Sequence, residues 1–170
     1  MSKLELAKSR RQFLQYLLTG TSFSLAAKWL FSQPSNSFEL VQSARCNPTS
    51  PDILGPFYQP NAPLRNRVGS GYVLTGVVKS VNNCRPLTGA KIELWLVGLD
   101  GEYSDRYRAT IFSDKNGAYR FESHFPPPYS SRPPHIHLRV TAKNHQELIT
   151  QHYPIERSKS AQFPLALIPN

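Results

Sequence analysis

The sequence is poor in cysteine and in long apolar runs, and it shows no long helical pattern after residue 33. Two cysteines among 170 residues, with neither one close to a histidine in the sequence, disfavour a zinc site built on thiolates. The apolar stretch near the N-terminus is short for a bilayer span and is interrupted by Gln15 and Lys28, which disfavours a permanent transmembrane helix. What remains is a chain of short apolar segments separated by turns.

Proline and glycine, by contrast, are frequent, with 15 and 9 residues. Tyr, Phe, Val and Ile gather in short runs between them, which favours an all-β fold over a helical bundle. With 39% hydrophobic residues, the chain is predicted to form one domain with a real core.

The formal net charge of +9 is spread along the chain and does not form a basic stripe. The first 33 residues hold five basic side chains and one acidic one, and the other 137 residues hold 15 basic and 10 acidic ones. We interpret the charge as ordinary surface charge and expect no nucleic-acid partner; a preference for anionic or electron-rich ligands is the alternative.

The N-terminal segment SRRQFLQYLLTGTSFSLAAKWLF carries the paired arginines Arg10 and Arg11, followed by Phe13 and Leu14. This pattern resembles a twin-arginine export signal, so residues 1–33 are predicted to direct the protein through the twin-arginine machinery to the periplasm or the cell surface. The alternative is an amphipathic N-terminal helix. Because the twin-arginine route carries folded proteins, often with a cofactor already loaded, it favours a metal protein.

Both cysteines lie in the part of the chain that would be exported. A pair in an oxidising compartment predicts a disulfide between Cys46 and Cys84, which would pin the N-terminal arm to the sheet. Two unrelated buried thiols are the alternative.

The rest of the chain divides by composition. Residues 34–70 are rich in Ser, Asn and Pro and predict an extended arm over the core. Residues 71–160 alternate in about seven short runs and predict a prealbumin-like β-sandwich, and residues 161–170 are expected to form a C-terminal tail. Non-catalytic prealbumin-like binding modules share such a frame, so this part alone does not establish an enzyme.

The stretch RPPHIHLRV places two histidines two positions apart on a predicted strand. Alternate strand residues share a face, so His135 and His137 point the same way, while Ile136 and Leu138 face the core. Residues i and i+2 lie roughly 7 Å apart, which lets two imidazoles reach one metal ion. The pair is therefore a candidate metal site that needs further ligands.

Tyrosines are the nearest candidates for those ligands. Tyr103 stands at a strand start, and Tyr129 ends the run FPPPY just before the histidines. A phenol has a free pKa of about 10, so only a strong Lewis acid such as Fe(III) holds it as a phenolate near neutral pH. The alternative is a different metal enzyme, such as one with an iron(II) site of two histidines and a carboxylate. Its carboxylate would have to come from Asp105, Asp114 or Glu122.

Several motifs, taken together and in this order, resemble those of the intradiol ring-cleavage dioxygenases, the protocatechuate and catechol dioxygenases. The motifs are GPFY (55–58), CRPLTGAKIELW (84–95), GEY (101–103), SDKNGAYRF (113–121), PPPYSSRPPHIH (126–137) and ITQHY (149–153). The resemblance covers well over half of the chain.

The resemblance implies an Fe(III) cofactor held by Tyr103, Tyr129, His135 and His137, with Tyr129 as the ligand that the substrate displaces. It implies that Arg132 lies over the bound catecholate and stabilises its developing negative charge. The resemblance also implies that Gln151 is a supporting polar residue of the catalytic site. Apart from the resemblance, Tyr58 is a candidate substrate contact, for which packing is the alternative.

The activity implied by the resemblance is cleavage of an aromatic diol by O2 between its two hydroxyls, giving a muconate-type diacid. Tyr129 and a hydroxide would take up the protons of the substrate as general bases. The helical N-terminal dimerisation domain typical of catechol dioxygenases is missing from the chain, which leaves an oligomer as an open question.

The paired arginines generate a first prediction. Replacing Arg10 and Arg11 together by lysine should leave the protein in the cytoplasm, because the export machinery reads the arginine pair itself. Cell fractionation measures this outcome, and export of the double variant at the unchanged level would show that the segment has another role.

Overall fold

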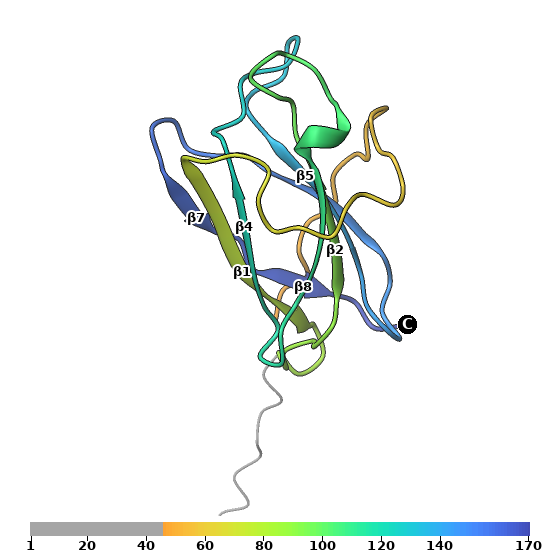
Figure 1. Cartoon of the computed structure of the whole chain (residues 1–170). Helices are drawn as coiled ribbons and strands as arrows, with labels where there is room; N and C mark the ends of the chain where they lie inside the picture. The colour runs from red at the N-terminus through yellow and green to blue at the C-terminus, as the bar shows by residue number, and fades with distance from the viewer. Residues whose placement is uncertain (1–45) are drawn as a thin grey trace, which may run out of the picture. The chain divides into compact units, whose positions relative to one another are not determined.

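The structure, a computed structural model, describes residues 46–170, which form two packed four-stranded β-sheets (Figure 1). The strands are β1 (Tyr72–Ser80), β2 (Lys91–Trp95), β3 (Arg108–Phe112), β4 (Ala118–Ser123), β5 (Ile136–Thr141), β6 (Leu148–His152), β7 (Ser160–Gln162) and β8 (Leu165–Leu167). A 3-10 turn, η1 (Asp105–Tyr107), precedes β3. The predicted all-β sandwich is confirmed.

One sheet has the order β4-β1-β7, with β8 also paired to β1, and the other has the order β3-β2-β5-β6. Their facing sides are apolar because strand residues alternate between the two sides. Leu74 and Phe121 from the first sheet and Ile92, Leu94 and Leu138 from the second are at most 1% exposed. Burying each such side chain contributes about 1.5–3 kcal/mol, so this shared core holds the sheets together.

The opposite face of the β3-β2-β5-β6 sheet is also largely buried, although it carries polar side chains. The register places Trp95 beside His137 and Glu93 beside Arg139, on the side away from the core. His137 is also paired with Gln151 of β6. A polar face of this kind needs a cover that supplies hydrogen-bond partners.

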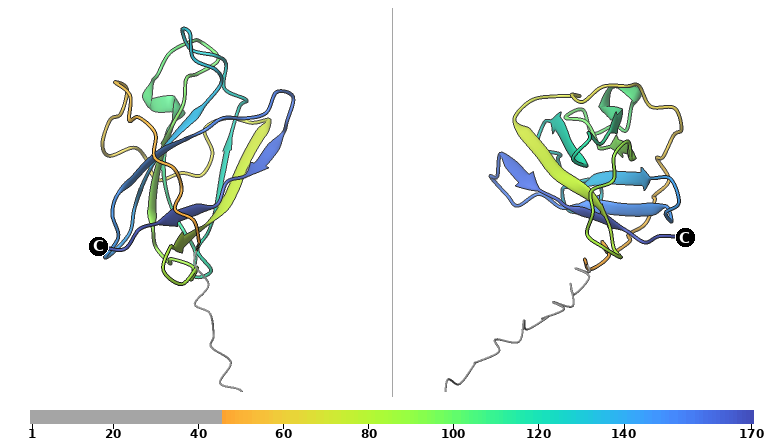
Figure 2. Two further views of the ribbon diagram at one scale, coloured as in Figure 1. Left: turned by 180° about the vertical axis from the view of Figure 1, so that it is seen from behind. Right: turned by 90° about the horizontal axis from the view of Figure 1, so that it is seen from below.

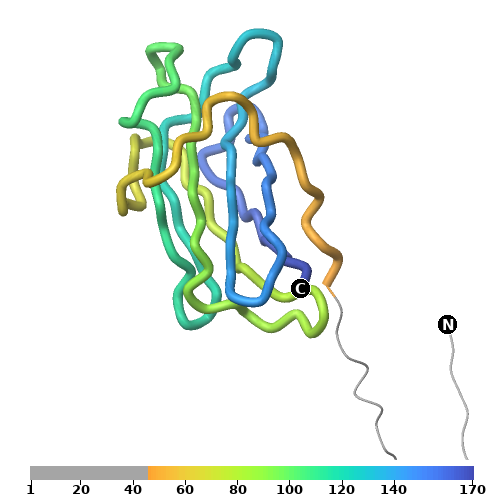
Figure 3. Tube along the Cα trace, turned by 90° about the vertical axis from the view of Figure 1, so that its right-hand side faces the viewer, coloured from red at the N-terminus to blue at the C-terminus, as the bar shows by residue number. Residues whose placement is uncertain are grey.

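The cover is the arm that precedes β1, which the structure describes from residue 46. In Figure 3 the orange part of the arm rises beside the blue strands and then crosses over the upper end of the sheet. Its backbone bonds to the sheet without forming a strand: Asp52 N donates to Ile149 O at 2.9 Å, and Thr110 N donates to Pro63 O at 2.8 Å. The arm thus lies over the sheet, as predicted, for the part that is described.

The end of the chain differs from the expected tail. β7 and β8 both run parallel to β1, and the left view of Figure 2 shows them as blue strands beside it. Leu165 and Leu167 are buried in the core. Each strand has only three residues, and Phe163 and Pro164 separate them, so neither shows enough alternation to be found by its period.

The predicted export signal, residues 1–33, and the first part of the predicted arm lie outside the described residues. Among residues 46–170 no helix is long and apolar enough to cross a membrane.

Cys46 and Cys84 are bonded to each other in the structure, with their Cα atoms 5.3 Å apart. The bond ties the described start of the arm to the turn between β1 and β2, and Cys46 N also donates to Val81 O at 3.1 Å. The disulfide closes a loop between residues that are 38 positions apart, where the described part of the arm begins.

The bond generates a second prediction. Replacing both cysteines by serine should lower the free energy of unfolding by about 2–5 kcal/mol, because the unfolded chain regains the freedom of the closed loop. Denaturant unfolding measures the change, and mass spectrometry without reductant should find no free thiol. Two free thiols in the purified protein would contradict the bond.

Candidate functional site

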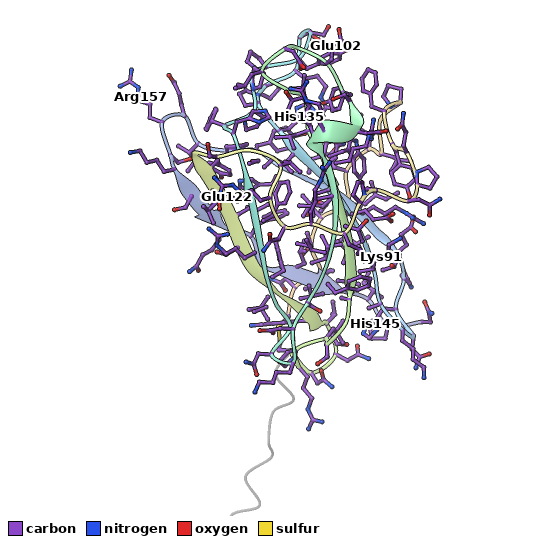
Figure 4. The ribbon with its side chains drawn as sticks, in the orientation of Figure 1. Lys91, Glu102, Glu122, His135, His145 and Arg157 are labelled. Carbon is purple, nitrogen blue, oxygen red and sulfur yellow. A yellow bond between two sulfur atoms is a disulfide. The ribbon has the colours of Figure 1, made fainter. Side chains whose placement is uncertain are left out.

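The two histidines predicted as ligands meet at the start of β5. His135 directly precedes the strand and His137 lies within it, and they are 1% and 3% exposed. Their Nε2 atoms are 3.1 Å apart. Figure 4 shows His135 near the end of the molecule marked by Glu102, whereas His145 lies at the opposite end.

The tyrosines join this pair from two loops. The Tyr103 hydroxyl lies 3.2 Å from His135 Nε2, and the Tyr103 and Tyr129 rings pack edge to face with centroids 5.1 Å apart. All four side chains line one cavity of about 360 Å³. The structure therefore brings together every residue that the sequence predicted as a metal ligand.

A tight turn sets Tyr129 beside Arg132. Tyr129 and Arg132 exchange backbone hydrogen bonds of 3.2 and 2.9 Å, and Ser130 between them has a φ of 53°. Prolines on both sides of the turn, in FPPPY and RPPH, restrict the backbone and keep it from joining the sheet. Arg132 consequently lines the same cavity as the tyrosines.

The surroundings of each imidazole fix its orientation. His135 Nδ1 lies 2.7 Å from Pro133 O, so Nδ1 carries the proton and the lone pair of Nε2 faces the cavity. His137 stacks flat on Trp95, with ring centroids 4.8 Å apart. Gly55, at a φ of +75°, approaches so closely that an added Cβ would lie 3.2 Å from His137 Cε1.

Burial sets the charge state of the site. It lowers the pKa of His135, and it lowers the pKa of His137 to about 3, with the charge of His135 as a second cause. Burial, followed by the neighbouring Tyr129, raises the pKa of Tyr103 to about 12. At neutral pH the imidazoles are therefore neutral bases with free lone pairs, and the Tyr103 phenol would ionise only beside a strong Lewis acid.

A carboxylate ligand is missing from this arrangement. Within residues 46–170, no three His, Cys, Asp or Glu side chains are grouped so that they could hold a metal ion. The three carboxylates that an iron(II) site would borrow have other partners: Asp105 pairs with Arg108, Asp114 accepts from the backbone of the turn before β4, and Glu122 pairs with Arg67 and Arg120. The donor set in the cavity is two imidazoles and two phenols, which suits Fe(III).

Gln151 supports the site from β6. Its Oε1 accepts a hydrogen bond from Arg132 Nη2 at 2.9 Å, and its Nε2 donates to Ile53 O of the arm at 2.7 Å. Gln151 thus links Arg132 to the arm, in keeping with the supporting role implied by the resemblance.

Tyr58 lies behind the cavity wall and does not line it. Its hydroxyl accepts a hydrogen bond from Arg139 Nη1 at 2.7 Å, and its ring packs edge-on against Trp95. The preceding residue, Phe57, faces the cavity instead and stacks on Tyr103 with centroids 4.3 Å apart. Packing, the alternative interpretation of Tyr58, accounts for these contacts.

Sequence reasoning missed the arm residues of the cavity wall. Ile53, Gly55 and Phe57 all line it, although only Tyr58 of the GPFY motif received a role. The glycine was the available signal, since a glycine between larger residues marks a close backbone approach or a positive φ.

A comparison with family models matches residues 58–159 to a family described as Dioxygenase. This match covers more than half of the chain. The chain belongs to the dioxygenase family.

Relatives within the dioxygenase family carry intradiol names. The intradiol ring-cleavage dioxygenase prcA of Aspergillus niger is 28% identical over 68% of this chain and 48% of its own length. A chlorocatechol 1,2-dioxygenase of Rhodococcus opacus is 29% identical over 82% of this chain and 69% of its own length. The chain thus spans about half of the Aspergillus protein and about two thirds of the Rhodococcus one.

A solved dioxygenase structure has the same fold. The dioxygenase domain of a carbohydrate-binding fusion protein from Streptomyces sp. SirexAA-E superposes with a TM-score of 0.66, at 22% identity. The match covers 73% of this chain and all of that domain.

The contact of Gly55 with His137 generates a third prediction. Gly55→Ala should lower the free energy of unfolding by about 1–2 kcal/mol, because alanine is strained at positive φ, and it should also displace the imidazole. The affinity for added ferric iron should then fall by roughly tenfold, as for the loss of a supporting contact at a metal ligand.

Gly89→Ala is the matched control. Gly89 has a φ of +68°, an added Cβ would meet nothing within 4 Å, and it is not next to any of the proposed ligands in the sequence. Thermal unfolding and iron titration of both variants should show a similar loss of stability but a loss of iron affinity only at Gly55. Equal iron affinity in the two variants would contradict the role assigned to the close approach.

Proposed function

We propose that this protein is a non-haem Fe(III) dioxygenase that cleaves a catechol-type ring between its two hydroxyls with O2, giving a muconate-type diacid. The observation that carries the proposal is the convergence of His135 Nε2, His137 Nε2 and the Tyr103 hydroxyl, with Tyr129 beside them in one cavity. The intradiol names of the relatives support the same reaction.

The four side chains would hold the iron through two neutral nitrogens and two phenol oxygens. Hard anionic oxygen favours the ferric over the ferrous state, which suits the absence of a grouped carboxylate among the described residues. When bound, ferric iron would supply a Lewis acid that holds both catechol oxygens and makes the ring reactive toward O2.

Tyr129 is the side chain best placed to move a proton. It lies in a short loop turn, and its described ring contacts are edge-to-face packing against Phe57 and Tyr103. We expect its phenol oxygen to leave the site when a catechol enters and to accept the proton that one catechol hydroxyl loses.

Arg132 and the arm prepare the rest of the cavity. Arg132 lines the cavity, and its positive charge would lie near a bound ring that gains electron density; a charge oriented in advance needs no rearrangement during the reaction. Ile53, Pro56 and Phe57 form an apolar wall that can pack on the flat face of an aromatic ring and exclude water.

The alternative of a non-catalytic prealbumin-like module explains less. Such a module has no need for two buried imidazoles with adjacent Nε2 atoms or for a phenol within hydrogen-bond distance of them. We therefore favour the enzyme.

We also propose that the protein is exported to the periplasm or the cell surface. The paired arginines of the N-terminal segment support this location. The disulfide between Cys46 and Cys84 also supports it, because such bonds persist in oxidising compartments.

The proposal gives a fourth prediction. The purified protein, loaded with iron, should be red or brown from phenolate-to-iron charge transfer and should consume O2 when members of a panel of catechols are added. Arg132→Ala should keep its iron and colour but lose about 10²–10³-fold in kcat, the usual effect of removing one group that stabilises developing charge.

Arg106→Ala serves as the control, because Arg106 is exposed and lies outside the cavity lining. Its turnover, iron content and colour should equal those of the wild type. A colourless protein that holds zinc or no metal and consumes no O2 with any catechol would refute the proposed function.

A further inference from the structure

Tyr153 directly follows β6, its ring lies 6.0 Å from the ring of His135, and its hydroxyl has three close neighbours. Arg132 Nη2 is 2.7 Å away, Asp52 Oδ2 is 2.9 Å away and Gln151 Oε1 is 3.0 Å away. Neither the predicted site nor the proposed reaction uses Tyr153 or Asp52.

The number of protons on each group fixes which one donates and which one accepts in this cluster. Nη2 of Arg132 has two protons and can only donate, so it serves both Gln151 Oε1 and the Tyr153 oxygen. The Tyr153 hydroxyl has one proton, which goes to Asp52 because a carboxylate is a stronger acceptor than an amide oxygen that is already in use. The order is therefore Arg132 to Tyr153 to Asp52.

Asp52 is itself held in place. Its backbone N–H donates to Ile149 O at 2.9 Å, and its Oδ1 accepts from Ile53 N at 2.7 Å. Partial burial would raise the pKa of Asp52, but the hydrogen bonds from Ile53 and Tyr153 and the charge of Arg132 lower it overall. The chain of hydrogen bonds thus ends on an ionised carboxylate that is anchored to β6.

These bonds restrain a side chain that is otherwise free to turn. An arginine has several rotatable bonds, and fixing them costs conformational entropy that the partners must offset. Among the described residues, both hydrogen bonds of the Arg132 side chain fall on Nη2, so Gln151 and Tyr153 hold the guanidinium of a residue that lines the cavity.

We propose that Tyr153 and Asp52 are positioning residues that fix the guanidinium of Arg132 over the ring of the substrate. This inference rests on the proposed function for its effect on turnover. It concerns the orientation of Arg132. The Tyr153 ring also lies 6.0 Å from the His135 ring, a contact that phenylalanine at position 153 would keep.

The first test is kinetic. Tyr153→Phe removes the acceptor for Nη2 and the donor for Asp52 while keeping the ring, and it should lower kcat by about tenfold, as expected for the loss of one hydrogen bond to a charged group. Iron content and colour should not change. Asp52→Asn should lower kcat less, and the double variant should equal Tyr153→Phe, because Asp52 acts on Arg132 through Tyr153.

Tyr119→Phe is the matched control for a lost tyrosine hydroxyl. Its hydroxyl donates to Phe163 O at 2.6 Å on the other sheet, remote from the cavity. This variant should lose thermal stability and keep its kcat. If Tyr153→Phe behaves in the same way, Tyr153 merely anchors the arm and the proposal is wrong.

The second test needs neither iron nor turnover. An arginine-selective dicarbonyl reagent, applied to the metal-free protein, should label Arg132 several-fold faster in Tyr153→Phe than in the wild type, because a freed guanidinium is more accessible. Peptide mass spectrometry gives the rate, with Arg157, whose side chain is 92% exposed, as the internal reference.

The two tests separate the two proposals. Faster labelling of Arg132 in a protein that consumes no catechol would support the positioning role and refute the proposed function. Unchanged labelling in a protein that does consume catechol would overturn the positioning role alone.

Discussion

The hydrogen bonds between the arm and the outer face of the β3-β2-β5-β6 sheet are the interactions on which the site depends. That face carries Trp95, His137 and Gln151, all buried, and the polar atoms of Gln151 need partners, which Arg132 and the arm supply. The arm supplies backbone carbonyls, such as Ile53 O for Gln151, in the place of an additional strand. The cavity lies where this irregular cover meets the Tyr103 loop, the Tyr129–Arg132 turn and the start of β5, so the arm forms one of its walls.

A buried ionic group supports the same face further along the strands. Glu93 is 2% exposed, and its carboxylate accepts from Lys91 and Arg139, the latter also donating to the Tyr58 hydroxyl. A buried carboxylate is costly unless it is paired in this way, and removing one partner would leave an uncompensated charge. Because Tyr58 packs on Trp95 and Trp95 on His137, this group holds the layer of rings behind the site.

The strand part of the site could be predicted from the sequence, and the loop part could not. A period of two residues places His135 and His137 on one side of β5 without further information. Tyr103 and Tyr129 come from loops without a period, so the residues alone made them candidate ligands, and the resemblance to a family gave each its role. The arm also lacks a period, and there sequence reasoning gave a role to Tyr58 where the structure places Phe57 at the cavity. The contact of Tyr153 with Asp52 joins residues 101 positions apart, which no local pattern reveals.

That separation along the chain also determines at what stage of synthesis the cavity can form. The arm is anchored by Thr150 to Ser50 O and by Gln151 to Ile53 O, bonds between residues 100 and 98 positions apart. A chain emerging from the ribosome has therefore completed β6 before the Ser50–Ile53 part of its arm can bond to the sheet. Until then this part of the Ile53–Phe57 wall is not held in place, and the cavity is open to water on that side. The closed cavity is consequently a product of the finished domain.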